Sequence, residues 1–301
     1  MLPNFFVIGA AKAGTTSIWE FLRHHPEVFM PEGFKESNHF LLNGARADFQ
    51  GPGDYWLNQL AVHDRADYVR LFDEAEGQIA VGEVCPFYMA STEIPGRIRS
   101  FAPEAKIVAI LRNPADRAFS SYLHLVRDRR EDLDFASSLR REAERAAQNW
   151  EPLWRYRDLG LYHKYLSVYF DQFDASRIRI YLFEELTRGN RATLADLMQF
   201  LGIDDSVNIE LAKVNSAAHA TLSRTRTIED LVFRENVVKR VAKRILPEES
   251  IRKARNLLLN ANRYSPRFDP AVRRELQDFY RPDIERLEKL IDRDLGHWLV
   301  T

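Results

Sequence analysis

Short apolar stretches of the chain alternate with longer segments in which apolar residues recur every three or four positions. The short stretches are rich in β-branched and aromatic residues, which predicts strands at 5–8, 28–30, 79–84, 106–111 and 178–183. The longer segments predict helices at 16–23, 91–101, 115–130, 162–173 and 191–201. Strands that alternate with helices are joined by crossover connections, which favour parallel pairing and cover both faces of a sheet. We therefore predict an α/β fold in three layers, with a central, mainly parallel sheet flanked by helices.

Two segments interrupt this alternation. Residues 43–54 contain three glycines, one proline and few apolar residues, which predicts an exposed loop. Loops of this length are often functional lids. After residue 208 the pattern changes to helical runs, predicted at 228–245, 248–261 and 269–295. We find neither a Pro- or Ser-rich linker nor an internal repeat. We expect a single domain over residues 1–301, with a core at about 1–205 and a helical C-terminal subregion at about 206–301.

The composition is that of an ordinary globular protein, with 45% hydrophobic and 29% charged residues among 301. Lys and Arg (43) nearly balance Asp and Glu (44), so no global field favours a nucleic-acid or anionic membrane partner. The single cysteine, Cys85, excludes an internal disulfide, and no apolar run approaches the ~20 residues of a membrane span. Too few residues precede the first strand for a signal peptide. We expect a cytoplasmic protein, and the oligomeric state stays open.

A loop rich in small residues follows the first predicted strand. It reads Gly9-Ala10-Ala11-Lys12-Ala13-Gly14-Thr15-Thr16 and leads into the first predicted helix. Successive backbone N–H groups and the positive end of a helix make such a turn an anion-binding site. In a P-loop that cleaves nucleoside triphosphates a lysine follows the second glycine, but here Thr15 stands there and Lys12 lies inside the loop. The loop is therefore P-loop-like, and ATP cleavage is disfavoured.

A second motif stands at the end of the predicted strand 106–111. It begins Arg112-Asn113-Pro114 and continues through Ser120 and Ser121 to Tyr122. Together with the loop Lys12-Ala13-Gly14-Thr15-Thr16-Ser17, it resembles the two nucleotide-binding motifs of sulfotransferases that use 3′-phosphoadenosine 5′-phosphosulfate (PAPS), in the branch of carbohydrate (heparan-type) and bacterial enzymes. Further matches follow in the family's order at Lys35-Glu36, Gly82-Glu83, Gly160-Leu161-Tyr162 and Leu295-Gly296-His297-Trp298. The resemblance covers most of the chain.

The resemblance implies an enzyme that moves a sulfuryl group from PAPS to a hydroxyl or amine of a small-molecule or glycan acceptor. The residues that it implies for the 5′-phosphosulfate are Lys12, Ala13, Gly14, Thr15, Thr16 and Ser17. It implies that Arg112 and Ser120 hold the 3′-phosphate, a task that suits the planar guanidinium of arginine. Arg224 lies where the family closes a segment over the nucleotide and is a further candidate. No metal is expected, because two separate phosphate sites replace one cradle for a triphosphate and Mg²⁺.

The transfer step needs a base for the acceptor's proton and positive charge at the leaving phosphate. The resemblance assigns the base to Glu36, with a surface Lys-Glu pair as the alternative. Lys12 would stabilise charge on the bridging oxygen as the bond to sulfur breaks. His39 stands where the family usually has phenylalanine, so it is either a second catalytic or substrate-contacting residue or a structural one.

The chain also departs from the family pattern. Val84 stands where carbohydrate members often carry a lysine near the acceptor, which favours a neutral or less acidic acceptor. Arg117 is expected to be a charge on the helix surface, and Cys85 to be a packed small residue. The aromatic residues around Trp150, Trp154 and Tyr156 either line an acceptor cleft or pack in the core.

Two rival functions stay open at this point. A P-loop kinase or NTPase would turn over ATP with Mg²⁺, and the threonine at the lysine position argues against it. A nucleotide-binding protein without catalysis would bind the donor and transfer nothing.

Overall fold

The computed structural model describes residues 1–33, 35–187, 191–209, 222–223, 263–264 and 266–300. Within this part of the chain, five strands form one parallel sheet in the order β2-β3-β1-β4-β5. These strands are β1 (Phe5–Gly9), β2 (Val28–Phe29), β3 (Ala80–Val84), β4 (Lys106–Leu111) and β5 (Ile178–Leu182). The parallel sheet predicted from the alternating pattern is confirmed.

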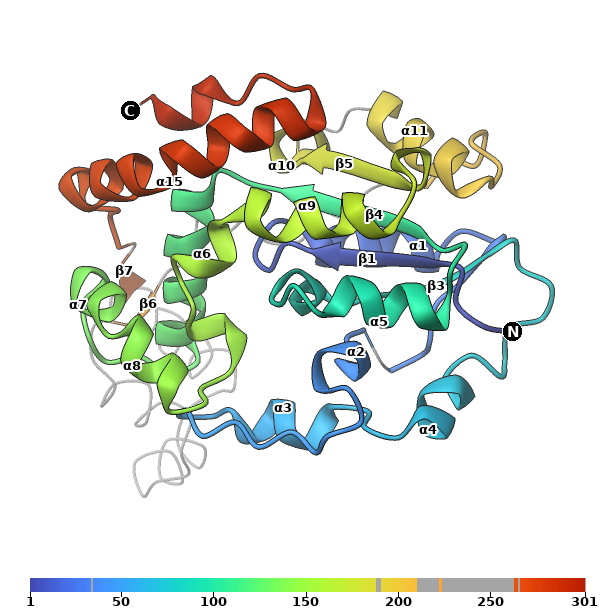
Figure 1. The fold of residues 1–301 in the computed structure, drawn as a ribbon, viewed down its shortest axis with the longest axis horizontal. Helices are drawn as coiled ribbons and strands as arrows, with labels where there is room; N and C mark the ends of the chain where they lie inside the picture. The colour runs from blue at the N-terminus through green and yellow to red at the C-terminus, as the bar shows by residue number, and fades with distance from the viewer. Residues whose placement is uncertain (34, 188–190, 210–221, 224–262, 265, 301) are drawn as a thin grey trace, which may run out of the picture.

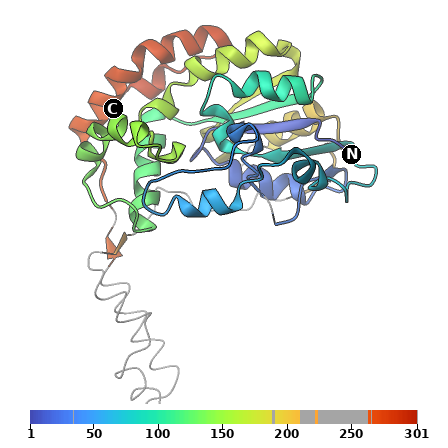
Figure 2. The same cartoon turned by 60° about the horizontal axis from the view of Figure 1, so that its bottom comes forward.

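Helices cover both faces of this sheet, which completes the three predicted layers. In Figures 1 and 2, α5 and α9 lie over one face, and α1 and α11 lie over the other. Their bounds are Thr15–Arg23 for α1, Ile94–Phe101 for α5, Tyr162–Gln172 for α9 and Arg191–Leu201 for α11. Every residue of β1 and β3 is buried, as continuous apolar strands between two helical layers must be.

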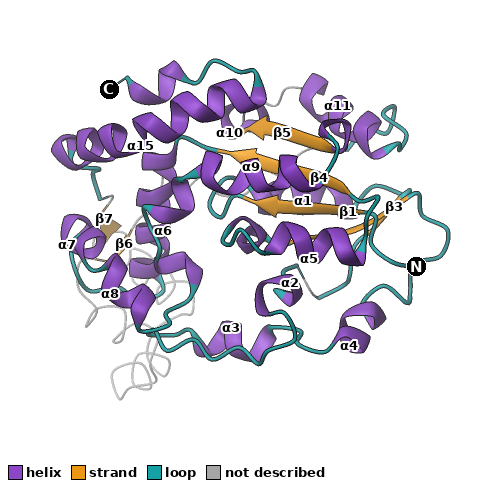
Figure 3. Cartoon of the chain, in the orientation of Figure 1, coloured by secondary structure: helices purple, strands orange, loops and turns teal. Residues whose placement is uncertain are grey.

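Helix α6 (Pro114–Arg127) stands at the carboxyl end of the sheet, where β1 and β4 both end (Figure 3). Its start is well defined, because Asn113 caps the helix through hydrogen bonds from the N–H groups of Ala115 and Asp116 to its side chain. Pro114 occupies the first helical position, where no N–H donor is required. A sharp turn therefore leads from the end of β4 directly into α6.

The segment between β2 and β3 forms the lower rim of the view in Figure 1. It contains α2 (His39–Leu42), α3 (Tyr55–Leu60) and α4 (Arg65–Arg70), and the loop predicted at 43–54 lies between α2 and α3. Asp54 fixes the end of that loop, since its buried carboxylate accepts hydrogen bonds from the indole of Trp154 (3.0 Å) and the N–H of Glu151 (2.8 Å). The rim is thereby tied to the segment that follows α6.

The remaining elements extend the domain beyond the sheet. They are η1 (Pro86–Met89), α7 (Phe135–Arg140), α8 (Glu142–Ala147), η2 (Pro152–Trp154), η3 (Asp158–Gly160), η4 (Ala175–Arg177), α10 (Phe183–Thr187), a two-stranded antiparallel pair of β6 (Leu222–Ser223) and β7 (Arg263–Tyr264), α15 (Pro270–Ile291) and η6 (Gly296–Leu299). Helix α15 packs against α9 and α6, and its buried residues include Leu276 and Tyr280. The helical runs predicted at 228–245 and 248–261 lie outside the described residues.

Candidate functional site

The loop between β1 and α1 has the backbone of an anion-binding turn. Gly14 caps α1 with a left-handed φ of 91°, and an added Cβ would lie 3.1 Å from the ring of Phe183, so a side chain at this position would be strained. Ala10 N–H donates to the carbonyl of Ile110 at 2.7 Å, which anchors the loop to the end of β4. The first N–H groups of a helix have no carbonyl partner one turn earlier within it and form the positive end of its dipole.

Lys12 lies inside this loop, with a left-handed φ of 70°. Burial, followed by the positive charge of Arg127, lowers the pKa of its ammonium to about 8. Among the described residues, no carboxylate forms an ion pair with it. A partly buried ammonium with no ion-pair partner in the described part of the chain is suited to bind an anionic ligand.

Arg112 brings the second predicted motif against the first. Its Nη1 donates to the backbone carbonyl of Lys12 at 3.2 Å, and its guanidinium lies 4.8 Å from the centre of the Phe183 ring. Burial lowers the pKa of Arg112, and within the described chain it has no carboxylate ion-pair partner. The two strand ends therefore meet at one edge of the sheet, as the parallel pairing of β1 and β4 requires.

Ser120 lies on α6, two turns after Arg112, and is 3% exposed. Its hydroxyl has no hydrogen-bond partner among the described residues. Buried polar groups in folded proteins are nearly always paired, so an unpaired hydroxyl beside a nucleotide motif indicates a place for a ligand oxygen. The next residue, Ser121, is also buried, but its hydroxyl accepts a hydrogen bond from Arg117 at 3.1 Å.

Arg117 corrects a prediction. It was expected on the helix surface, yet its side chain is fully buried. Its guanidinium donates to the Ser121 hydroxyl and to the backbone carbonyl of Tyr156, so it joins α6 to the segment before α9. Arg117 and Ser121 are four residues apart and therefore share one side of the helix, and both are buried.

Glu36 lies in the loop that follows β2, with about a third of its side chain exposed. Lys35 Nζ lies 2.6 Å from its carboxylate. The charge of Lys35 also contributes to the lowered pKa of Lys12. The Lys35–Glu36 pair therefore lies within electrostatic reach of the loop at residues 9–16, called the phosphate loop below. Arg112 thus contacts the loop that carries Lys12, and Lys35, the neighbour of Glu36, lies close enough to affect the charge of Lys12.

His39 lies at the start of α2 with its ring stacked on Tyr68, at 4.3 Å between ring centres and 6° between planes. Its Nδ1 is 3.0 Å from the carbonyl of Val62, and burial lowers the pKa of the imidazole. These neighbours are those of a packed aromatic ring. A role for His39 in catalysis stays a prediction, and the contacts favour the structural alternative.

Three other predictions concern packing. Cys85 is fully buried, as expected for a packed small residue, and burial raises the pKa of its thiol well above the usual value. Trp154 and Tyr156 are buried in the core, and Trp150 packs against it with its ring 4.7 Å from that of Trp154. The core alternative for these aromatic residues is therefore confirmed. Arg224 lies outside the described residues.

Two residues on α6 escaped the sequence analysis. His124 and Arg127 follow Ser120 at spacings of four and seven, so all three share one side of the helix. Burial, with the charge of Lys12 as the next cause, lowers the pKa of His124 to about 4, and Arg127 Nη2 lies 2.7 Å from its Nδ1. The helical spacing from Ser120 was the signal that could have found them.

A buried acidic cluster borders the same region. Arg130 pairs with both Asp54 and Glu151, whose side chains are almost fully buried. Burial raises the pKa of Glu151 to about 7, and the charges of Asp54 and Glu36 contribute to this shift. Glu36 therefore lies within electrostatic reach of the segment that carries Trp154.

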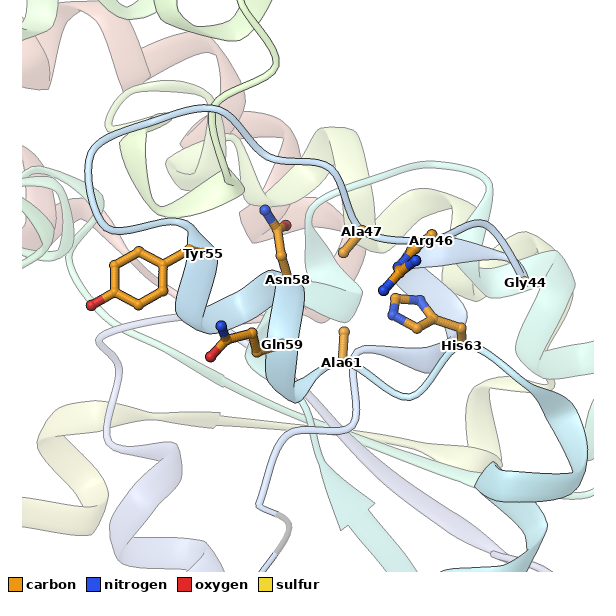
Figure 4. Close-up of a pocket in the computed structure, with 8 residues that line it drawn as sticks. All are labelled: Gly44, Arg46, Ala47, Tyr55, Asn58, Gln59, Ala61 and His63. Carbon is orange, nitrogen blue, oxygen red and sulfur yellow. The ribbon is translucent and has the colours of Figure 1, made fainter.

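A cavity of about 730 Å³ opens between α3 and the loop predicted at 43–54 (Figure 4). Its lining includes Arg46, Tyr55, Gln59 and His63, and none of the eight described residues that line it is a carboxylate. The backbone joins this wall to the Glu36 loop, because Val62 N–H donates to the carbonyl of Ser37 at 2.9 Å. The cavity is separate from the phosphate loop and neighbours the Glu36 side of the site.

The described residues contain neither a cluster of metal ligands nor a helix that could span a membrane. No three His, Cys, Asp or Glu side chains in these ranges lie close enough together to hold a metal ion. None of the helices in the part of the chain that the structure covers has the length and apolarity required to cross a membrane.

Comparison with known proteins places this geometry in a family. The sulfotransferase family profile matches residues 3–206. The crystal structure of a sulfotransferase from Alicyclobacillus acidocaldarius is 35% identical, with a TM-score of 0.79 over 99% of both chains. Mouse heparan sulfate glucosamine 3-O-sulfotransferase 3A1 is 26% identical over 98% of this chain, which spans 64% of the relative's length. Human bifunctional heparan sulfate N-deacetylase/N-sulfotransferase 3 is 33% identical over 41% of this chain and 13% of its own length.

The family profile covers more than half of the chain, and the bacterial structure matches it from end to end at 35% identity. The two motifs on which the resemblance rested, at Lys12–Ser17 and from Arg112 to Tyr122, both lie within the matched residues. The chain belongs to the sulfotransferase family.

Proposed function

We propose that this protein transfers a sulfuryl group from PAPS to a hydroxyl or amine of a small-molecule or glycan acceptor, with Glu36 as the general base. The observation that carries the proposal is the meeting of two anion-binding elements at one sheet edge, where Arg112 contacts the carbonyl of Lys12 at 3.2 Å. One element is the phosphate loop and the other is the start of α6. A nucleotide with two separate phosphate groups fits such a pair.

The residues present fit this donor. Among the described residues, the Ser120 hydroxyl has no hydrogen-bond partner, and neither the Arg112 guanidinium nor the Lys12 ammonium has a carboxylate ion-pair partner. In the proposal, Arg112 and Ser120 bind the 3′-phosphate. Residues 12–17 bind the 5′-phosphosulfate through backbone N–H groups, Lys12 and the hydroxyls of Thr15, Thr16 and Ser17.

The proposed transfer follows from these positions. The acceptor oxygen or nitrogen attacks the sulfur in line with the bridging oxygen, a new bond to sulfur forms, and the bond from sulfur to the bridging oxygen breaks. The Glu36 carboxylate takes the acceptor's proton, and the Lys12 ammonium stabilises the negative charge left on the phosphate. Lys35 Nζ lies 2.6 Å from the Glu36 carboxylate and is its neighbour in the chain.

The acceptor is proposed to be neutral. Val84 is fully buried on β3, so it offers no cation at the position where carbohydrate members often carry lysine. The cavity beside α3 supplies one arginine together with amide, phenol and imidazole groups, which suits hydroxyl groups better than a dense polyanion. Heparan sulfate is the substrate named for two relatives, and a strong preference for it here would overturn this part of the proposal. The cytoplasmic location expected from the sequence stays a prediction.

The rival functions differ in what they bind and turn over. Calorimetry with adenosine 3′,5′-bisphosphate, beside ATP with Mg²⁺, tests the donor. Labelled PAPS with a panel of neutral glycosides, simple alcohols and heparan sulfate then tests transfer. We expect bisphosphate binding and sulfation of neutral acceptors. Binding of ATP without binding of the bisphosphate would contradict the assignment, and binding without any transfer would support a non-catalytic nucleotide-binding protein.

A further inference from the structure

A chain of buried hydrogen bonds runs from the carboxyl end of β3 to the loop that carries Glu36. It begins at Glu83, which is 2% exposed and sits on β3. One oxygen of its carboxylate, Oε1, accepts hydrogen bonds from the hydroxyls of Tyr88 (2.5 Å) and Tyr68 (3.0 Å). Both tyrosines are fully buried, so water does not compete for these bonds.

The Tyr88 hydroxyl links this carboxylate to the Glu36 loop. Its single proton goes to Glu83, so it accepts at its lone pairs from the hydroxyl of Ser37 (3.1 Å) and the N–H of Phe40 (3.5 Å). Ser37 Oγ in turn accepts from the N–H of His39 at 3.2 Å. The donor and both acceptor positions of the Tyr88 hydroxyl are thereby used. Ser37, the residue after Glu36, is held by a hydrogen bond to this hydroxyl.

A second bond holds Glu36 through Asn38, two residues further along the chain. Asn38 is 1% exposed and has a left-handed φ of 55°, and its Nδ2 donates to the backbone carbonyl of Glu36 at 3.2 Å. The Cys85 thiol donates to Asn38 Oδ1 at 3.3 Å. Both attachments come from the short segment that follows β3, namely Cys85 and the η1 turn.

Glu36 itself is less buried than the two residues that follow it. Ser37 and Asn38 are almost completely buried, whereas about a third of the Glu36 side chain is exposed. The only described side-chain partner of the Glu36 carboxylate is the neighbouring Lys35. The location of the carboxylate is therefore set through the backbone, by the buried residues that follow it.

We infer that the Tyr88 hydroxyl, anchored by Glu83, is a positioning group that holds the proposed base Glu36 in its reactive location by fixing Ser37 and Phe40. The inference rests on the proposed function, because it assigns to Tyr88 an effect on the step that Glu36 performs. Tyr88 touches neither donor nor acceptor in this scheme. Its loss lowers turnover and leaves donor binding intact.

The test compares tyrosine-to-phenylalanine changes that each remove one buried hydroxyl. Tyr88→Phe removes the link to the loop. Tyr68→Phe removes the other donor to the same Glu83 oxygen, and it has no bond to the loop. Tyr156→Phe is the matched control elsewhere, since its buried hydroxyl donates to the buried carboxylate of Glu131 at 2.9 Å. Ser37→Ala removes the loop end of the link and leaves every core ring in place.

Hydrogen exchange, read by mass spectrometry over residues 35–42, needs no acceptor. Tyr88→Phe and Ser37→Ala are expected to speed exchange there, and the two control variants to leave it unchanged. With labelled PAPS and the best acceptor of the neutral panel, the first two variants lower kcat by about tenfold or more and keep bisphosphate affinity within about twofold. Combined with Glu36→Gln, neither lowers kcat further, because the group it positions is gone.

Distinct results overturn the inference and the proposed function. If Glu36→Gln abolishes turnover while Tyr88→Phe and Ser37→Ala behave like the two controls, the positioning role is wrong and the base assignment stands. The same conclusion follows if losses from Tyr88→Phe and Glu36→Gln multiply in the double variant. If Glu36→Gln itself retains turnover, the base assignment fails and the positioning role falls with it.

Discussion

The guanidinium of Arg112 donates a hydrogen bond to the backbone carbonyl of Lys12 at 3.2 Å. Arg112 follows β4 and Lys12 follows β1, and these strands are parallel neighbours in the sheet. The two proposed phosphate-binding elements are thus connected directly by the Arg112 side chain and also by the pairing of β1 with β4. A change at Arg112 should accordingly disturb both ends of the donor site.

Arg112→Ala is expected to weaken the binding of adenosine 3′,5′-bisphosphate by about 10- to 100-fold, because hydrogen bonds to charged groups contribute about 1.5–3 kcal/mol. Arg112→Lys should recover only part of this, since an ammonium cannot replace the planar fork. Calorimetry checks both. Arg179→Ala is the control, because Arg179 is a half-exposed arginine on β5 that pairs with Asp196. Equal losses in the control and in Arg112→Ala would refute the assigned role.

Ser120→Ala should separate folding stability from donor binding. The buried Ser120 hydroxyl has no partner among the described residues, so its removal is expected to leave the melting temperature of the free protein unchanged or to raise it. The same change should reduce the stabilisation that added bisphosphate provides. Ser121→Ala should instead lower the melting temperature of the free protein and keep the stabilisation by bisphosphate, since the Ser121 hydroxyl accepts a hydrogen bond from the buried Arg117. Thermal melts with and without bisphosphate distinguish the two patterns.

Donor affinity should fall as pH rises through about 8. Burial lowers the pKa of Lys12 to about 8 in the free protein, and a bound anion favours the charged ammonium and raises that pKa. Binding then takes up a proton where free Lys12 is neutral and bound Lys12 is charged. Calorimetry in two buffers of different ionisation enthalpy measures this uptake above pH 8. Lys12→Met should remove it, and an unchanged uptake in that variant would assign the proton to another group.

Glu36→Gln is expected to lower turnover by about 10²- to 10⁴-fold, the usual contribution of a general base, and to leave bisphosphate affinity unchanged. Single-turnover rates with labelled PAPS measure the first, and calorimetry measures the second. Glu32→Gln provides a control, because Glu32 is an exposed carboxylate four residues earlier in the same loop. A loss of donor affinity that matched the loss of rate would contradict the role as base.

Much of the sheet could be predicted because its strands are continuous apolar runs. The strand predicted at 106–111 matches β4 (Lys106–Leu111), and the helix predicted at 191–201 matches α11 (Arg191–Leu201). The helix predicted at 91–101 begins later, at Ile94, because Pro95 fits only the first turn of a helix. The helix predicted at 115–130 ends at Arg127, and Arg129 has a left-handed φ of 61° that a helix cannot continue.

The site was less accessible to prediction, because its supporting contacts join residues far apart in the sequence. The two loops that hold phosphate in the proposal were found as motifs. The burial of Arg117 was missed, since its partner Tyr156 lies 39 residues away. The link from Tyr88 to Ser37 spans 51 residues, and neither residue type by itself indicates a positioning role. Local spacing can reveal which residues share a helix side, but not what faces them.

Helix α6 connects Ser120 to Arg127, and so connects the proposed 3′-phosphate end of the site to the surroundings of Lys12. A helix turns by about 100° at each residue. A single inserted or deleted residue between these two positions would rotate one of them by about 100° away from the side they share, whereas many substitutions on the outer side would leave both in place. The helix therefore acts as a spacer of fixed length and rotation. It should tolerate substitutions on its outer side but not the insertion or deletion of a residue.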